Sequence, residues 1–117
     1  MTTTLYGIPN CDQVRKARTW LDEKGIAYHF HDFKKAGLSR ELVDTWLGEV
    51  EWETLVNRRG TTWRALSEER KASVTDAESA AVLMLESPSI VKRPVLSSGG
   101  KIHVGFSDAL YQQIFKN

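Results

Sequence analysis

The stretch TLYGIPNCDQVRKARTWL, residues 4–21, decides the fold prediction. Its first part is rich in β-branched and aromatic residues, which is typical of a short strand over residues 3–8. The part after the strand places Val14, Ala17 and Leu21 at the spacing of one helix face. A strand that leads through a short turn into a helix is the first half of a βαβ unit.

The segments further along the chain predict a second strand, a helical region and a final ββα unit. Residues 26–33 (IAYHFHDF) alternate as a strand does, so the first third predicts a βαβ unit with parallel strands. Residues 39–90 are largely helical in pattern. Ser39 begins a capped helix over residues 39–47, residues 52–66 have a helical pattern, and a further helix opens at Thr75 or Asp76. PVLSSGGKIHVGF predicts a β-hairpin with its turn at residues 98–100, and SDALYQQIF predicts a closing amphipathic helix capped by Ser107.

This order of elements is typical of an α/β protein with a thioredoxin-like fold. We expect a mixed four-stranded sheet with flanking helices and an inserted helical subregion at about residues 39–90. A chain of 117 residues predicts a single domain over residues 1–117. That length is sufficient to bury a core without disulfides or a structural metal.

Composition gives no global sign of a nucleic-acid or membrane partner. The chain has 16 basic and 15 acidic residues, and its net charge is +1. Its N-terminus lacks the basic residues and apolar core of a signal peptide, and its longest apolar run is too short to span a bilayer. We therefore expect a cytoplasmic protein, a monomer, with no membrane partner.

Cys11 is the only cysteine, and it lies between the predicted strand and the predicted helix. One cysteine forms no internal disulfide, and four-cysteine zinc sites are excluded. The free N–H groups at a helix start favour a thiolate, and cysteines in such positions have pKa values of about 3.5–7.5. Arg15 and Lys16, one turn later, are expected to act in the same direction. The alternative is an inert buried cysteine, but polar Asn10 and Asp12 flank it, so we favour a reactive thiolate.

Two common cysteine motifs do not match. A Cys-x-x-Cys pair fails because Val14 occupies the second position, and the tyrosine-phosphatase pattern fails because Ala17 stands where an arginine is required. No internal resolving thiol is therefore available to Cys11.

Two later segments supply candidate anion-binding residues. VKRPVL places Arg93 directly before Pro94 at a strand entry, and NRRGTTWR contributes three further arginines, Arg58, Arg59 and Arg64. We expect the first and last of these three to lie on a solvated surface. If Arg59 and Arg93 both point at Cys11, the site suits a carboxylate or an oxyanion. Pro94 alone has a simpler interpretation as a strand-entry residue.

The histidines do not predict a metal site. His29 and His31 are two residues apart on one predicted strand, and a metal would need at least one more ligand. We expect no metal and no bound cofactor.

Three ordered segments, YGIPNCDQVRKARTWL, NRRGTTWR and KRPVL…GFSD, together resemble the ArsC/Spx family of thioredoxin-like proteins, and within it the YffB branch of small bacterial proteins. The resemblance implies that Cys11 is the catalytic cysteine. It also implies that Arg93 precedes a cis-proline, Pro94, facing the cysteine turn. The arginine of the family's inserted region corresponds to Arg59, with Arg58 adjacent.

The resemblance implies an oxidoreductase, most simply a glutathione-dependent thiol reductase, with glutathione or a glutaredoxin as the resolving thiol. Asn10 is expected to support the bound anion. Glutathione-linked arsenate reductases are an alternative, but their last clamp arginine falls on Gly105 here. A second alternative is a Spx-like regulator that binds RNA polymerase, although such proteins carry a second cysteine where this chain has Val14. The physiological substrate is not predicted.

Overall fold

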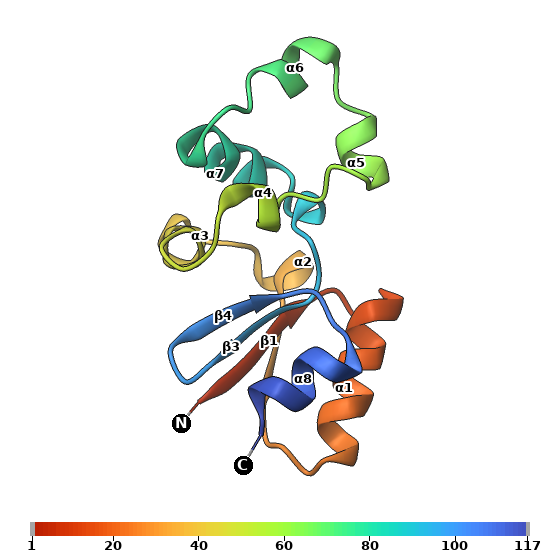
Figure 1. Ribbon diagram of the computed structural model, residues 1–117. Helices are drawn as coiled ribbons and strands as arrows, with labels where there is room; N and C mark the ends of the chain where they lie inside the picture. The colour runs from red at the N-terminus through yellow and green to blue at the C-terminus, as the bar shows by residue number, and fades with distance from the viewer. Residues whose placement is uncertain (1, 117) are drawn as a thin grey trace. The chain divides into compact units, whose positions relative to one another are not determined.

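The computed structural model describes residues 2–116 of the chain. Backbone contacts divide the chain into two compact units. The first runs to Asp32 and resumes at Arg93, and the second comprises Phe33–Lys92 (Figure 1).

The first unit is built on a four-stranded mixed sheet. Its strands are β1 (Thr3–Gly7), β2 (His29–Asp32), β3 (Val95–Ser98) and β4 (Lys101–Val104). They lie in the order β2-β1-β3-β4, with β1 parallel to β2 and antiparallel to β3, and with β4 antiparallel to β3. The predicted sheet type is confirmed.

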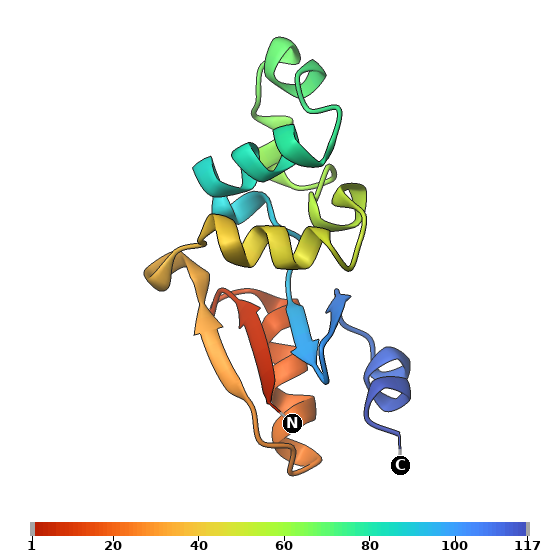
Figure 2. The ribbon, with the colours of Figure 1, turned by 90° about the vertical axis from the view of Figure 1, so that its left-hand side faces the viewer.

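Helices α1 (Asp12–Glu23) and α8 (Asp108–Ile114) cover one face of this sheet. In Figure 2, α1 lies behind the strands. The buried residues of this core come from both strands and both helices, and they are Leu5, Ala17, Trp20, Leu21, Leu96 and Tyr111. The indole Nε1 of Trp20 donates a hydrogen bond to Asp108, which ties α1 to the start of α8.

Local signals set the ends of these elements. Gly25, just past α1, has a φ of 68°, and the Ser107 hydroxyl accepts a hydrogen bond from the Leu110 N–H at the start of α8. Gly99 and Gly100 both have positive φ, as a two-residue hairpin turn requires. The hairpin prediction is confirmed, but β3 extends through Ser98, so the turn is shorter than expected.

The second strand is shorter than the predicted range of residues 26–33. Ile26 and Tyr28 precede β2, although they pack with Phe30 against the core, as the alternation indicated. Phe33 leaves the sheet because it is fully buried in the second unit, where it begins α2 (Phe33–Ala36).

The second unit is helical. It contains α2, α3 (Arg40–Leu47), α4 (Trp52–Leu55), α5 (Thr61–Arg64), α6 (Glu68–Ala72), α7 (Ala77–Glu86) and the 3₁₀ turn η1 (Pro88–Ile90). Helices α3 and α7 pack together around Trp46, Leu83 and Met84, which are buried. Ser39 caps α3, and Asp76 caps α7.

The helical pattern over residues 52–66 forms two short helices, α4 and α5, because backbone pairing interrupts it. The Asn57 N–H donates to the Ile90 carbonyl at 2.8 Å, and the Lys92 N–H donates to the Leu55 carbonyl at 2.7 Å. These bonds hold the residues after α4 in extended backbone, so Arg59 lies in a turn between α4 and α5. Over residues 2–116, no helix has the length and apolar content to cross a membrane.

Candidate functional site

A tight turn places Cys11 directly at the start of α1. The Cys11 N–H donates to the Ile8 carbonyl at 3.2 Å, which closes a β-turn with Pro9 and Asn10 at its two central positions. Proline suits the first of these because its ring fixes φ. Asn10 is exposed on this turn, and Cys11 is the half-exposed N-cap residue of α1.

Gly7 allows α1 to approach the end of β1 closely. A Cβ at this position would lie 2.7 Å from Cγ2 of Val14, which is shorter than real Cβ contacts. Val14 is fully buried in the first turn of α1. The missing side chain at Gly7 therefore sets where the first turn, and Cys11 with it, sits on the sheet.

The surroundings of Cys11 favour its charged form. Burial alone raises the pKa of the Cys11 thiol, but the Val14 N–H, the Arg93 guanidinium and the Gln13 N–H together hold that pKa below its ordinary value. Each of these three groups is a hydrogen-bond donor, and a donor beside the sulfur favours the thiolate over the neutral thiol. The structure thus brings Arg93 and Cys11 together.

Pro94 and Gly105 lie next to each other beside this pair. The Arg93–Pro94 peptide bond is cis, as the fold led us to expect. Pro94 is buried, and its carbonyl accepts a hydrogen bond from the Gly105 N–H at 2.8 Å. Gly105 has a φ of 88°, a backbone conformation that disfavours any residue with a side chain.

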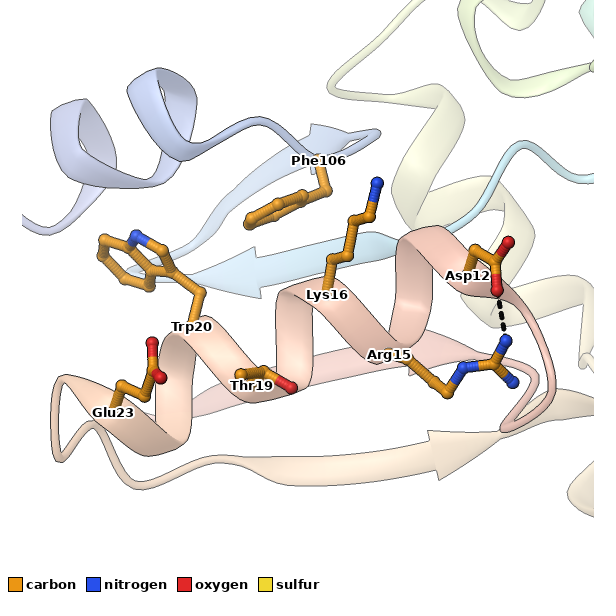
Figure 3. Close-up of a pocket in the computed structure, with 7 residues that line it drawn as sticks. All are labelled: Asp12, Arg15, Lys16, Thr19, Trp20, Glu23 and Phe106. Atoms are coloured by element: carbon orange, nitrogen blue, oxygen red, sulfur yellow. Dashed lines mark hydrogen bonds and ion pairs between the residues drawn. The ribbon is translucent and has the colours of Figure 1, made fainter.

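The cation that acts on Cys11 is Arg93 rather than Arg15. Arg15 forms an ion pair with Asp12 on the exposed face of α1 (Figure 3). Its charge is therefore engaged locally, and Lys16 is exposed on the same helix.

Arg59 belongs to the second unit and lies in a hollow of about 380 Å³ there. Its N–H donates to the Asn57 side chain at 3.2 Å, and both Arg58 and Lys92 also line this hollow. The Arg58 guanidinium lies 5.6 Å from the centre of the Trp52 ring, a cation–π contact. Arg64 is exposed, as expected. A role for Arg59 toward the substrate stays a prediction.

A groove along α1 was not predicted from the sequence. It holds about 350 Å³ and is lined by Asp12, Arg15, Lys16, Thr19, Trp20, Glu23 and Phe106 (Figure 3). The spacing of residues 12, 16, 19 and 23 marks one helix face, but Phe106 joins them only through the tertiary fold. Among the described residues, His, Cys, Asp and Glu side chains form no cluster of three suited to a metal.

A half-exposed thiolate at a helix start is a nucleophile toward disulfide sulfur or other electrophiles. Arg93 favours the charged form of this sulfur. The arrangement is thus chemically suited to thiol–disulfide exchange.

The comparisons with known proteins cover almost the whole chain. The model of the ArsC family matches residues 6–114. An uncharacterized protein of Haemophilus influenzae is 39% identical over 112 residues, which cover 96% of this chain and 97% of the relative. The global transcriptional regulator Spx of Streptococcus mutans is 26% identical over 108 residues, covering 90% and 77% of the two chains.

Solved structures agree with the fold. A protein described as YffB is 50% identical, with a TM-score of 0.91 over 96% of this chain and 97% of its own. An arsenate reductase (ArsC) related protein from Brucella melitensis is 53% identical, with a TM-score of 0.78 over 100% and 97%.

Proposed function

Because this chain belongs to the ArsC family, we propose that it is a glutathione-dependent thiol reductase with Cys11 as its single nucleophile. The observation that carries the proposal is the half-exposed thiol at the start of α1, whose pKa burial raises but the Val14 and Gln13 amides and Arg93 lower overall. A thiol with a lowered pKa presents more of the thiolate that attacks oxidised sulfur.

The reaction has two exchange steps. In the first, the Cys11 thiolate attacks the glutathione sulfur of a glutathionylated thiol, forms a mixed disulfide with it and releases the substrate thiolate, which takes up a proton. In the second, a glutathione thiolate attacks the glutathione sulfur of that mixed disulfide and releases Cys11 as the thiolate. Glutathione disulfide is the product: one of its halves comes from the glutathionylated substrate and the other from one free glutathione, whose thiol is the net reductant and supplies the proton that the substrate thiolate takes up. Because Cys11 is the only cysteine, the second thiol comes from outside the chain.

Other residues have supporting roles in this proposal. Arg93 stabilises the Cys11 thiolate, and Pro94 shapes the backbone beside it. Asn10, exposed on the preceding turn, is proposed to bind an anionic group of the substrate. Arg59, exposed in the second unit, is proposed separately as a substrate-binding residue. Glutathione is a co-substrate, a glutaredoxin is an alternative resolving partner, and both are consistent with a cytoplasmic location.

The test measures reduction of a glutathionylated peptide by glutathione, coupled to NADPH oxidation by glutathione reductase. We expect turnover that Cys11→Ser abolishes and Arg93→Ala lowers several-fold. Arg64→Ala is the matched control, since this arginine is exposed in the second unit and lies outside the groove on α1. Mass spectrometry of the wild type is expected to trap one glutathione on Cys11. Equal activity in Cys11→Ser, or no adduct, rejects the proposal.

Arsenate reduction is the competing enzyme function, favoured by the relative described as related to arsenate reductase. The position that corresponds to the last clamp arginine of such enzymes is Gly105, whose φ of 88° disfavours an arginine. This function predicts arsenate-dependent oxidation of glutathione that Cys11→Ser abolishes.

A regulatory role is the competing function of a different class, favoured by the Spx relative. It predicts a complex with RNA polymerase that survives Cys11→Ser in a pull-down. A complex of this kind without any thiol reductase turnover would replace the enzyme proposal.

A further inference from the structure

The groove on α1 has a rigid aromatic floor. Phe106 packs edge-on against Tyr111 with ring centres 4.8 Å apart, and Trp20 does the same at 5.6 Å. The hydrogen bond from Trp20 to Asp108 fixes the indole further. A floor held in this way is ready to bind the apolar parts of a ligand without first being ordered.

Lys16 gives the groove an uncommitted positive charge. Arg15 is paired with Asp12, whereas no carboxylate within residues 2–116 pairs with Lys16. Figure 3 shows the Lys16 side chain rising from α1 beside the Phe106 ring. A cation next to an aromatic surface suits a ligand with a carboxylate and an adjoining peptide or methylene chain.

Helix geometry limits how far along the groove a ligand bonded to Cys11 extends. Lys16 lies five residues from Cys11, or about 7.5 Å along the helix axis at about 1.5 Å per residue. Glu23, at the far end of the groove, lies about 18 Å from Cys11 on the same basis. An extended tripeptide spans at most about 10 Å and, in the glutathione class, carries its sulfur on the central residue, so about half of this span extends from Cys11 toward a terminal carboxylate. Together with the long Lys16 side chain this covers the axial separation to Lys16, whereas Glu23 lies beyond it.

We propose that this groove binds a small peptide thiol, of the glutathione class, with its carboxylate at Lys16 and its chain over Phe106. This inference rests on the proposed function, because it names the place where the thiol co-substrate sits. The groove would then favour a carboxylate-bearing thiol over a neutral thiol of similar reactivity. Lys16 is here a binding residue, and Cys11 remains the reacting group.

The experiment measures only the attack of an added thiol on a mixed disulfide at Cys11, without the preceding step in which Cys11 reacts with a substrate. Cys11 is converted to its 2-thiopyridyl mixed disulfide, and added thiol is followed by the absorbance of released 2-thiopyridone. The incoming thiolate bonds to the Cys11 sulfur, the old S–S bond breaks, and the leaving group takes the proton. The quantity measured is the rate constant for glutathione divided by that for 2-mercaptoethanol.

We expect Lys16→Gln to lower this ratio about two- to fivefold, as the loss of an exposed ion pair permits, and Lys16→Glu to lower it further. Lys101→Gln is the matched control, because it removes one exposed positive charge from β4 outside the groove. An unchanged ratio in Lys16→Gln, or an equal fall in Lys101→Gln, overturns the inference.

A second measurement does not depend on Cys11 chemistry. S-methylglutathione is titrated into Cys11→Ser while amide shifts are followed by NMR, and we expect shifts along the groove face of α1 and at Phe106 that weaken in Cys11→Ser/Lys16→Gln. Shifts elsewhere only, or none, overturn the inference. If both measurements succeed while glutathionylated peptide is not turned over, the proposed function fails and the thiol site stands. If glutathionylated peptide is turned over but Lys16→Gln leaves the ratio of the two rate constants unchanged, the proposed function stands and the thiol site fails.

Discussion

At Cys11, burial and polar contacts act on the thiol in opposite directions. Burial raises its pKa, and the donors around it, Val14, Arg93 and Gln13, outweigh that effect. Two of these donors are backbone amides that any sequence with this turn would supply. Arg93 is the only one of the three whose side chain provides the donor, so it is the one that mutation removes cleanly.

Arg93→Ala is expected to raise the pKa of Cys11 and to slow its alkylation at pH 7 several-fold. The reason is that the thiolate loses a charge-assisted donor while the burial that disfavours charge remains. Iodoacetamide alkylation followed against pH measures both quantities. Arg93→Lys is expected to recover part of the effect, since it restores the charge but not the planar fork.

The control for this prediction is Arg15→Ala, which removes a cation one turn from Cys11. Because Arg15 pairs with Asp12, we expect a smaller change in the Cys11 pKa than Arg93→Ala gives. Equal shifts in both variants would mean that general charge near the helix start, rather than Arg93, sets the reactivity of the thiol.

Residue types and their neighbours predict only part of this site. Cys11 was evident from its place between a strand pattern and a helix pattern, and Arg93 from the proline that follows it. Two features could not be predicted from local patterns. The ion pair between Arg15 and Asp12 depends on side-chain rotamers, and the position of Phe106 beside α1 depends on tertiary contacts.

At the scale of elements, the contact between Gly7 and Val14 joins β1 to α1. We expect Gly7→Ala to lower the free energy of unfolding by about 1–3 kcal/mol, because its Cβ would overlap a buried and conformationally stiff side chain. The same displacement moves the first turn of α1, and Cys11 with it, away from Arg93, so the Cys11 pKa is expected to rise. Urea unfolding and pH-dependent alkylation measure the two effects.

Gly48→Ala is the matched control for a glycine-to-alanine change. Its Cβ would meet only ordinary contacts at 3.5 Å and beyond, and its φ of −73° suits alanine. We expect a change within about 0.5 kcal/mol, or slight stabilisation. A cost at Gly7 no larger than at Gly48 would show that α1 adapts to the added methyl group.

Elements whose ends are set locally were predicted well. The caps at Ser39 and Ser107, the cap of α7 (Asp76, one of the two candidates), and the glycines of the hairpin act within a few residues. The break in the helical pattern over residues 52–66 was missed for the opposite reason. Backbone bonds to Ile90 and Lys92, more than thirty residues away, compete with helix formation after α4, and a helical pattern of side chains carries no sign of them.

For the whole molecule, the lowered pKa of Cys11 links folding to pH. Between that lowered pKa and the ordinary value of about 8.5, the unfolded chain keeps a proton on the thiol that the folded chain has released. Stability rises with pH wherever the unfolded state binds more protons. The contribution of Cys11 is therefore absent at pH values below both pKa values, grows through this window and is complete above it.

We therefore expect the free energy of unfolding of the wild type, relative to that of Cys11→Ser, to increase as pH rises through the window. The other titrating groups are common to both proteins and cancel in the difference, which urea unfolding at several pH values in a phosphine reductant measures. Arg93→Ala is expected to flatten the rise, since it brings the folded and unfolded pKa values of Cys11 together. A difference that is constant or falls with pH would mean that the folded protein does not stabilise the thiolate. In that case the nucleophile on which the proposed chemistry depends would have only ordinary reactivity.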